Sequence, residues 1–172
     1  MKRGIELCIL PLAECQTAIP ALARWHHREW AWLNPGDTVE RRARRLRGQC
    51  LGRNPLPATW VALAEGRPLG SASLVAQDMD TRPGFTPWLA TVFVEPVHRG
   101  RGIGGALVRR VGEEAGRFGY RDLYLFTPDR AAWYGGFGWE ELETVSYRGS
   151  PVVVMKKSLP GPQSKEAPDS LK

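Results

Sequence analysis

A run of glycines and arginines in the middle of the chain has the composition of an anion-binding loop. The run, Arg99 to Gly105, follows an apolar segment at 89–94 and precedes apolar residues that recur at helical spacing up to Phe118. The first N–H groups of a helix have no partner within the helix and carry partial positive charge, so an anion is stabilised there. Glycines let an anion reach these groups, and the two arginines add full charge. The spacing predicts a site for a phosphate-bearing cofactor, with a tight turn between surface arginines as the structural alternative.

Two common phosphate-binding patterns fit this loop poorly. Gly100, Gly102 and Gly105 match the G-x-G-x-x-G fingerprint of dinucleotide-binding domains, which also needs an acidic residue about twenty positions later, at the end of the next strand. Asp122 has roughly this offset but lies at the start of the next predicted strand, and the remaining chain is too short for several more βα units. A P-loop is excluded because no Gly-Lys-Ser/Thr follows.

The loop and a later aromatic block together resemble the GCN5-related N-acetyltransferase family. Arg99-x-x-Gly102-x-Gly104 is similar to the Gln/Arg-x-x-Gly-x-Gly/Ala motif of that family. The segment 133–139, Trp-Tyr-Gly-Gly-Phe-Gly-Trp, looks like its Phe-Tyr-x-x-x-Gly-Phe/Trp segment, with Trp133 in place of the usual Phe. The resemblance extends in element order from about residue 5 to 157 and is sharp from 88 to 139.

The resemblance implies that acetyl-CoA is the cofactor. In the family, the loop holds the pyrophosphate, and backbone groups of the preceding strand hold the pantetheine arm. Carried over, the expected cofactor-binding residues are Val92, Phe93, Val94, Arg99, Gly100, Arg101, Gly102, Ile103, Gly104 and Gly105. The family's tyrosine lies beside the cofactor sulfur, so Tyr134 is expected to be the general acid. As an isolated observation, Tyr134 would be interpreted as an aromatic residue packed at a helix end.

The implied activity is acetyl transfer to a primary amine by direct attack in a ternary complex. The expected acceptor is a small molecule or a peptide N-terminus, and a homodimer is left open. One alternative keeps the fold but is a non-catalytic regulator that binds acyl-CoA. Another is a basic nucleic-acid-binding module, although nucleic acid is not the expected partner.

The general base is the least defined part of the predicted site. Some family members carry a glutamate early in the central strand, but that position falls near Trp88, which cannot accept a proton. The candidates elsewhere, acting directly or through water, are His26, Glu29, Asp78 and Asp80. The first two belong to an aromatic helical stretch at 25–32, which is expected either to form a wall of the acceptor site or to pack in the core.

Hydrophobic periodicity places these residues in a single α/β (α+β) domain with a mixed central sheet of about seven strands flanked by helices. Strands are predicted at 5–10, 59–64, 69–76, 89–94, 123–126, 140–147 and 152–156. Helices are predicted from about 20 to 33, 39 to 50 and 103 to 118, with a short one ending at Tyr134. Strands 89–94 and 123–126 should run parallel, because a helix joins them. The domain is expected to span 1–157, and 158–172 to be a disordered tail.

The second helix carries an arginine-rich face. Asp37 precedes Glu40 by three residues, which is akin to a capping box at the start of this helix. The arginines lie largely off its apolar stripe. They are Arg41, Arg42, Arg44, Arg45 and Arg47. They are expected to form a solvated face, with a nucleic-acid patch or attraction of an acidic substrate as alternatives.

Composition suits one globular domain. The chain has 172 residues, of which 42% are hydrophobic and 24% charged, with a net charge of +6. Neither a secretion signal nor a membrane-spanning stretch is apparent, so a cytoplasmic location is expected. Cys8, Cys15 and Cys50 lack metal-ligand spacing, and they are expected to be reduced core thiols with no bound metal.

Overall fold

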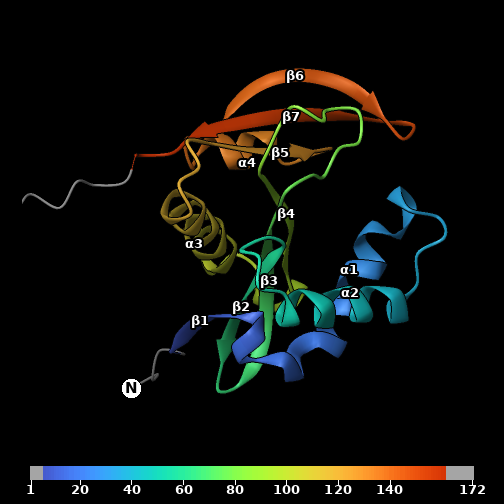
Figure 1. Cartoon of the computed structure of the whole chain (residues 1–172), viewed down its shortest axis with the longest axis vertical. Coiled ribbons are helices and arrows are strands. Elements are labelled where there is room, and N and C mark those ends of the chain that lie inside the picture. The colour runs from blue at the N-terminus through green and yellow to red at the C-terminus, as the bar shows by residue number, and fades with distance from the viewer. Residues whose placement is uncertain (1–5, 162–172) are drawn as a thin grey trace, which may run out of the picture.

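The computed structural model describes residues 6–161, and within this range seven strands form one mixed sheet (Figure 1). The strands are β1 (Leu7–Pro11), β2 (Ala58–Ala64), β3 (Arg67–Val75), β4 (Trp88–Val94), β5 (Asp122–Thr127), β6 (Glu140–Tyr147) and β7 (Ser150–Ser158). Their order across the sheet is β1-β2-β3-β4-β5-β7-β6. Only β4 and β5 pair in parallel among these strands, as expected for strands joined by a helix. The predicted mixed seven-stranded sheet is confirmed.

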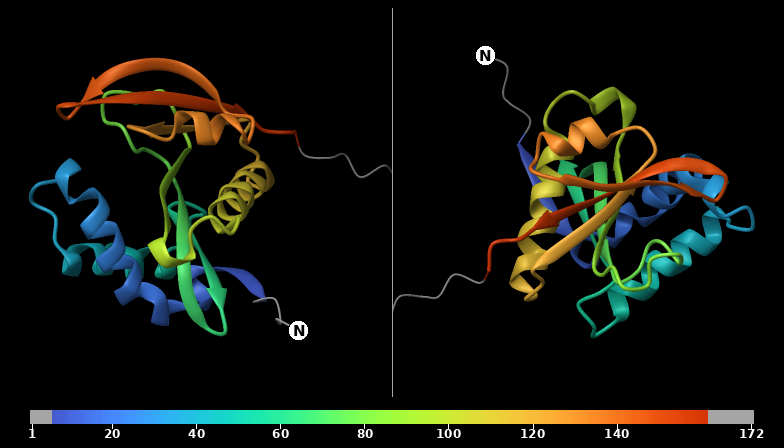
Figure 2. Two further views of the ribbon diagram at one scale, coloured as in Figure 1. Left: turned by 180° about the vertical axis from the view of Figure 1, so that it is seen from behind. Right: turned by 90° about the horizontal axis from the view of Figure 1, so that it is seen from above.

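Helices cover both faces of this sheet. The α-helices of the described region are α1 (Ile19–Trp30), α2 (Val39–Leu51), α3 (Ile103–Arg117) and α4 (Ala131–Gly135). Short 3₁₀ turns lie at Leu12–Glu14, Gln16–Ala18, Ala31–Leu33 and Pro96–His98. Figures 1 and 2 show α3 on one side of β4, and α1 with α2 on the other. Within residues 6–161 the apolar side chains form three clusters, one under α3, one under α1 and α2, and a third that includes Trp88 of β4 and Val152 and Val154 of β7.

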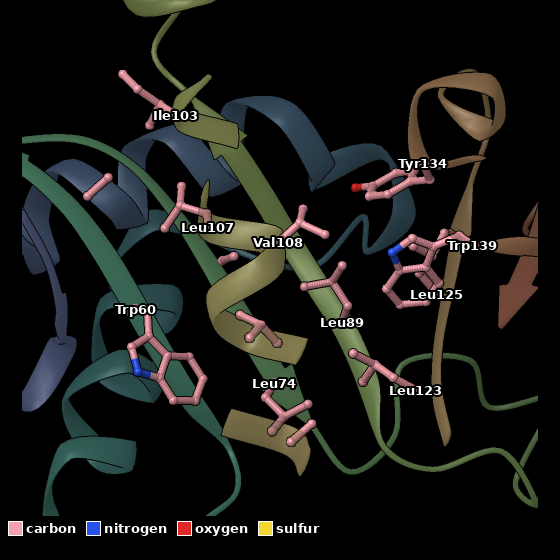
Figure 3. Packing of buried hydrophobic residues seen from close by; sticks show 14 of the residues in the cluster. Trp60, Leu74, Leu89, Ile103, Leu107, Val108, Leu123, Leu125, Tyr134 and Trp139 are labelled. Carbon is pink, nitrogen blue, oxygen red and sulfur yellow. The ribbon is translucent and has the colours of Figure 1, made fainter. Parts of the chain in front are cut away.

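Strand β3 shows how the sequence divides the two faces. Ala72 and Leu74 point toward α3 and belong to the core drawn in Figure 3, where Leu74 is labelled. Ser71 and Ser73 alternate with them, so both hydroxyls point toward α1 and α2. Strand β3 therefore contributes apolar packing to one face and buried polar groups to the other.

The sheet opens between β4 and β5. Within residues 6–161 the register of these strands contains a single Cα pair, Trp88 with Tyr124, next to a hydrogen bond from the Tyr124 N–H to the Pro87 carbonyl. Beyond this point, the two strands diverge. Backbone N–H and C=O groups that face the gap can then pair with an extended ligand, because an unpaired strand edge accepts a further chain.

Several boundaries differ from the predictions. Pro11 belongs to β1 and pairs with Trp60, which is tolerated because β1 is an edge strand. Ser158 still pairs with Asp122, and the Leu159 N–H donates to the Arg121 carbonyl, so the fold continues past the expected start of the tail. The remainder of the expected tail, 162–172, lies outside the described residues, as does most of the N-terminal segment before β1.

The three cysteines are free thiols, but they are not all core residues as expected. Cys8 is exposed on the edge strand, whereas Cys15 and Cys50 are partly buried. Burial raises the pKa of both Cys15 and Cys50 above the usual thiol value.

Candidate active site

The glycine-rich loop forms the N-terminus of α3 as predicted. Gly100 and Gly102 have φ angles of 73° and 80°, a left-handed conformation that glycine adopts without strain. Gly102 is the residue that caps α3, and no side chain caps this helix end. A Cβ atom on Gly104 would come within 3.3 Å of the Trp133 ring. The backbone N–H groups of the first turn are thus left open to a ligand, and the small residues let α4 approach closely.

A cavity of about 1040 Å³ connects this loop with β4, β5 and α4 on one side and with α1 and α2 on the other. Its lining includes all but two of the predicted site residues. The predicted residues that line the cavity are His26, Glu29, Asp78, Val92, Phe93, Val94, Arg99, Gly100, Gly102, Ile103, Gly104, Gly105 and Tyr134. Arg101 and Asp80 are exposed and do not line it; Asp80 instead lies 3.4 Å from Arg148. Residues far apart in sequence therefore meet around one space.

The wall at β4 is formed by an irregular part of the strand. The register with β3 shifts here, and among the described residues Thr91 and Val92 have no ladder partner on either neighbouring strand. Thr91 has a φ of 49°, which is unusual for a β-branched residue. Its hydroxyl donates to Ser73 Oγ at 2.7 Å, and Ser73 Oγ is 2.8 Å from Thr59 Oγ1. This hydroxyl chain holds the bulge that leaves β4 backbone groups facing the cavity.

Tyr134 lies on α4, where it is 9% exposed. Its ring packs edge-to-face between Trp133 and Trp139, with centroid distances of 4.9 and 6.1 Å. Figure 3 shows its hydroxyl pointing away from α4, toward the side on which β4 and α3 lie. Burial raises the pKa of Tyr134 above its usual value, so the phenol stays protonated across the physiological range.

His26 lies on α1 and is 3% exposed. Its Nε2 is 2.8 Å from Ser71 Oγ, and its ring packs against Trp30. Burial, with a smaller contribution from the Arg42 charge, lowers the pKa of His26 to about 3. The imidazole is therefore neutral and weakly basic.

Asp78 lies on the segment that follows β3. Burial raises its pKa to about 6, and the Arg148 charge opposes this shift. Glu29, which lines the same cavity from α1, is exposed. Of the four candidate bases, Asp78 combines a place in the cavity wall with a pKa close to neutrality.

Trp88 is fully buried, and its Nε1 donates to the Phe85 carbonyl.

Residues 19–134 match the sequence profile of the acetyltransferase (GNAT) family. This chain belongs to the GNAT acetyltransferase family. No curated protein matches the sequence closely enough to count as a relative. Among solved structures, a putative acetyltransferase from Salmonella typhimurium, determined with its cofactor acetyl-CoA, has a TM-score of 0.67 and 19% identity and covers 94% of this chain and 98% of its own.

Two further structures show the same GNAT fold. A ribosomal-protein-alanine N-acetyltransferase from Brucella melitensis has a TM-score of 0.68 and 23% identity, covering 88% of this chain and 99% of its own. An aminoglycoside 6'-acetyltransferase type Ii has a TM-score of 0.68 and 20% identity, covering 90% of this chain and 99% of its own. At these identities the likeness concerns the fold.

The GNAT cavity also has lining residues beyond the predicted site residues; of these, Trp133 belongs to the aromatic motif, and Trp30 and Trp32 belong to the stretch expected to form a wall of the acceptor site. Trp133, Phe137 and Arg109 lie beside the loop glycines, Arg130 lies near Tyr134, and Arg42, Arg45, Gln49, Trp30 and Trp32 lie on the side of α1 and α2. Arg109 lies one helical turn after Gly105, so its position was available from the spacing. The positions of the α2 residues could not be predicted from spacing, because the packing of α2 against the sheet decides which of its faces meets the cavity.

The start of α2 differs from the predicted capping box. The capping residue is Thr38, whose Oγ1 accepts from the Arg41 N–H at 3.1 Å. Asp37 instead pairs with two arginines of the helix, at 2.6 Å to Arg42 Nε and 2.7 Å to an Arg45 terminal nitrogen. The predicted solvated face is therefore wrong for Arg42, which is 9% exposed.

Two further properties concern residues 6–161 alone. In that range, no helix has both the length and the apolar character needed to cross a membrane. Nor do three or more His, Cys, Asp or Glu side chains gather there as metal ligands would.

Proposed function

We propose that this chain transfers the acetyl group of acetyl-CoA to a primary amine. The observation that carries the proposal is the single cavity that joins an open helix N-terminus to Tyr134 across the gap between β4 and β5. A phosphate-bearing cofactor with a long arm fits such a space, because the loop binds anions and the gap offers backbone groups. Bound acetyl-CoA would supply the thioester that an amine attacks.

The residues near the loop suit the charged part of this cofactor. The N–H groups that follow Gly102 would face a pyrophosphate, and Arg99 of the loop and Arg109 of α3 also line the cavity. The backbone of Val92 to Val94 would hold the arm along the open edge of β4. Arg101 is a weaker candidate for binding the cofactor, because its side chain does not line the cavity.

Tyr134 is the proposed general acid. Its buried hydroxyl keeps its proton until a stronger base, such as a departing thiolate, lies beside it. A simple thiol has a pKa of about 8.5 and a phenol about 10, so the donation is uphill by at least about 2 kcal/mol. Burial increases this cost while ensuring that the proton is present.

Asp78 is the proposed general base. An alkylammonium group has a pKa of about 10, roughly 6 units above an ordinary aspartate. The pKa of about 6 for Asp78 reduces that gap by about 2 units while the carboxyl stays ionised at neutral pH. His26, whose pKa is about 3, is a weaker base than an unperturbed histidine. Water can relay the proton if the amine does not contact Asp78 directly.

The test is thiol release from acetyl-CoA across a panel of primary amines, with cofactor binding measured by calorimetry. Gly102→Glu places a carboxylate and a strained φ at the helix N-terminus, so acetyl-CoA binding should fall at least about 100-fold. Gly66→Glu is the matched control, since Gly66 also has a positive φ but lies in the hairpin between β2 and β3. Equal acetyl-CoA affinity of the Gly102 variant and the parent would contradict the assignment of the loop.

A further inference from the structure

The α2 wall of the cavity carries a buried guanidinium group. Arg42 lines the cavity, is 9% exposed and lies close enough to His26 for its charge to lower the histidine pKa. Figures 1 and 2 show α2 and α3 on opposite sides of β4. Arg42 thus belongs to a different wall from the helix end that suits phosphates.

The charge of Arg42 is only partly compensated. Asp37, whose side chain is 5% exposed, approaches Arg42 Nε at 2.6 Å, but it also accepts two hydrogen bonds from Arg45, at 2.7 and 2.8 Å. One carboxylate thus serves two guanidinium groups, which leaves one net positive charge. Burial also lowers the pKa of Arg42 despite the contact with Asp37.

The hydrogen-bonding capacity of Arg42 is likewise not filled. Its buried Nε has no aligned acceptor within residues 6–161, although Asp37 lies close. A buried charged donor with a poorly aligned acceptor is less well stabilised than one in a complete hydrogen-bonded pair. A ligand carboxylate would match the planar guanidinium fork and bring the missing negative charge.

The same cavity presents carboxyl groups as well. Asp78 and Glu29 line it from the segment after β3 and from α1. An acceptor that carries only an amine would leave the charge of Arg42 only partly compensated. An acceptor with both an amine and a carboxylate would pair its amine with the carboxyl groups and its carboxylate with Arg42.

We propose that the acceptor is an amine that also carries a carboxylate, and that Arg42 binds the carboxylate. This assignment rests on the proposed acetyl transfer and specifies its substrate class. Arg45, whose side chain is largely exposed, has a supporting role because it shares Asp37 with Arg42.

The test compares matched acceptors that differ only in the anionic group. The series runs from glycine to 6-aminohexanoate, each acid being compared with its carboxamide in acetyl-CoA turnover and in binding by calorimetry. For the acid of best-fitting length, kcat/KM should exceed that of its amide by at least about 10-fold, which corresponds to about 1.4 kcal/mol. Tetrapeptides with Asp or Asn at the second position, compared in the same way, distinguish a peptide carboxylate from that of a free amino acid.

Variants then assign the preference to α2. Arg42→Gln should abolish the preference, so that each acid and its amide are turned over with the same kcat/KM within about twofold. Arg44→Gln, on the same helix but exposed and outside the cavity lining, should retain the full preference. If Arg42→Gln does not fold, Arg45→Gln provides the second measurement. It should reduce the preference in part, because Asp37 would then compensate Arg42 alone.

The outcomes separate this inference from the proposed function. Equal kcat/KM for acids and amides in the parent, with normal turnover, would overturn the role of Arg42 and leave acetyl transfer intact. A preference that survives Arg42→Gln would do the same. If no amine is acetylated, the proposed function fails, and tighter binding of acids than amides that is lost in Arg42→Gln would still support the carboxylate site.

Discussion

A Cβ atom on Gly105 would lie 2.8 Å from the ring of Phe137, closer than side-chain atoms approach one another. Gly105 lies in the first turn of α3, and Phe137 follows α4. The Phe137 ring also packs edge-to-face on Trp133 at 4.9 Å and lies under the Arg109 guanidinium. The last glycine of the loop therefore joins the two sequence motifs by packing, in addition to any contact with a ligand.

Gly105→Ala should destabilise the fold because the Phe137 ring must move away from its neighbours. Overpacking costs about 1–3 kcal/mol, and the better helix propensity of alanine returns about 1 kcal/mol of this. The net loss of about 0–2 kcal/mol should lower the melting temperature by up to about 8 °C. Gly112→Ala is the control on the same helix, since its Cβ would meet only Leu159, at 3.9 Å, and it should melt at or above the parent temperature. A Gly105→Ala variant as stable as Gly112→Ala would contradict the packing role.

Tyr134→Phe tests the proposed acid without altering the aromatic packing of α4. Loss of a general acid should reduce kcat on the order of 100-fold, while the KM for acetyl-CoA stays within about twofold of the parent. Stability should be retained, because the ring keeps its contacts with Trp133 and Trp139. Steady-state kinetics at pH 8 measures the effect, and an unchanged kcat with every accepted amine would assign the proton to another donor.

The elements of this fold could be predicted because their patterns are local. The segment from Trp88 to Arg117 shows a continuous apolar run before the glycine loop and apolar residues at period 3.6 after it, and the structure differs from the predicted ends by one residue. Capping was less predictable at α2, where Asp37 and Thr38 are both suitable residues. Tertiary pairing of Asp37 with Arg42 and Arg45 selects Thr38 as the cap.

The cavity could be predicted only in part, because its walls come from distant segments. The loop and Tyr134 belong to motifs, so their residues were named in advance. The burial of Arg42 depends on the packing of α1 against α2, and the separation of Asp78 from Asp80 depends on which side chain turns inward after β3. Neither has a signature in the sequence, since an arginine beside a helix stripe and an aspartate in a polar segment are usually solvated.

Asp78→Asn tests the proposed base through the pH dependence of acetyl transfer. With a pKa of about 6, the Asp78 carboxylate forms as the pH rises through 6, so kcat/KM of the parent should rise in that range. The asparagine variant should lose this limb and most of its activity at pH 7.5. Asp80→Asn, at an exposed carboxyl outside the cavity lining, should keep the parent profile. An unchanged limb in Asp78→Asn would assign it to another group of the enzyme.

Asp78 should also affect stability, with the sign opposite to that of a salt-bridged aspartate. Its folded pKa of about 6 lies above the unfolded value of about 3.9, so the folded state binds the proton more tightly. Ionising this carboxyl therefore destabilises the fold as the pH rises from about 4 to 6, and the cost persists above pH 6. Urea unfolding should show that Asp78→Asn gains stability relative to the parent between pH 4 and pH 7. A constant difference between the two proteins would argue against a buried carboxyl.

His26 should make the fold sensitive to acid below about pH 6.5. Its folded pKa of about 3 lies below the unfolded value of about 6.5, so the unfolded state takes up the proton first and stability is lost as the pH falls below 6.5. Between pH 7.5 and pH 5 this loss amounts to about 2 kcal/mol.

His26→Gln keeps a polar partner for Ser71 but cannot titrate, so its free energy of unfolding should decrease by about 2 kcal/mol less than that of the parent over the same interval. Urea unfolding of both proteins at pH 7.5 and pH 5 measures the change in the free energy of unfolding of each. The control, His27→Gln, replaces the neighbouring and only partly buried histidine and should follow the parent. If the free energy of unfolding changes equally in His26→Gln and the parent, His26 has the same pKa in the folded and unfolded states. It would then be a stronger base than burial predicts, and a candidate general base near the β4 bulge.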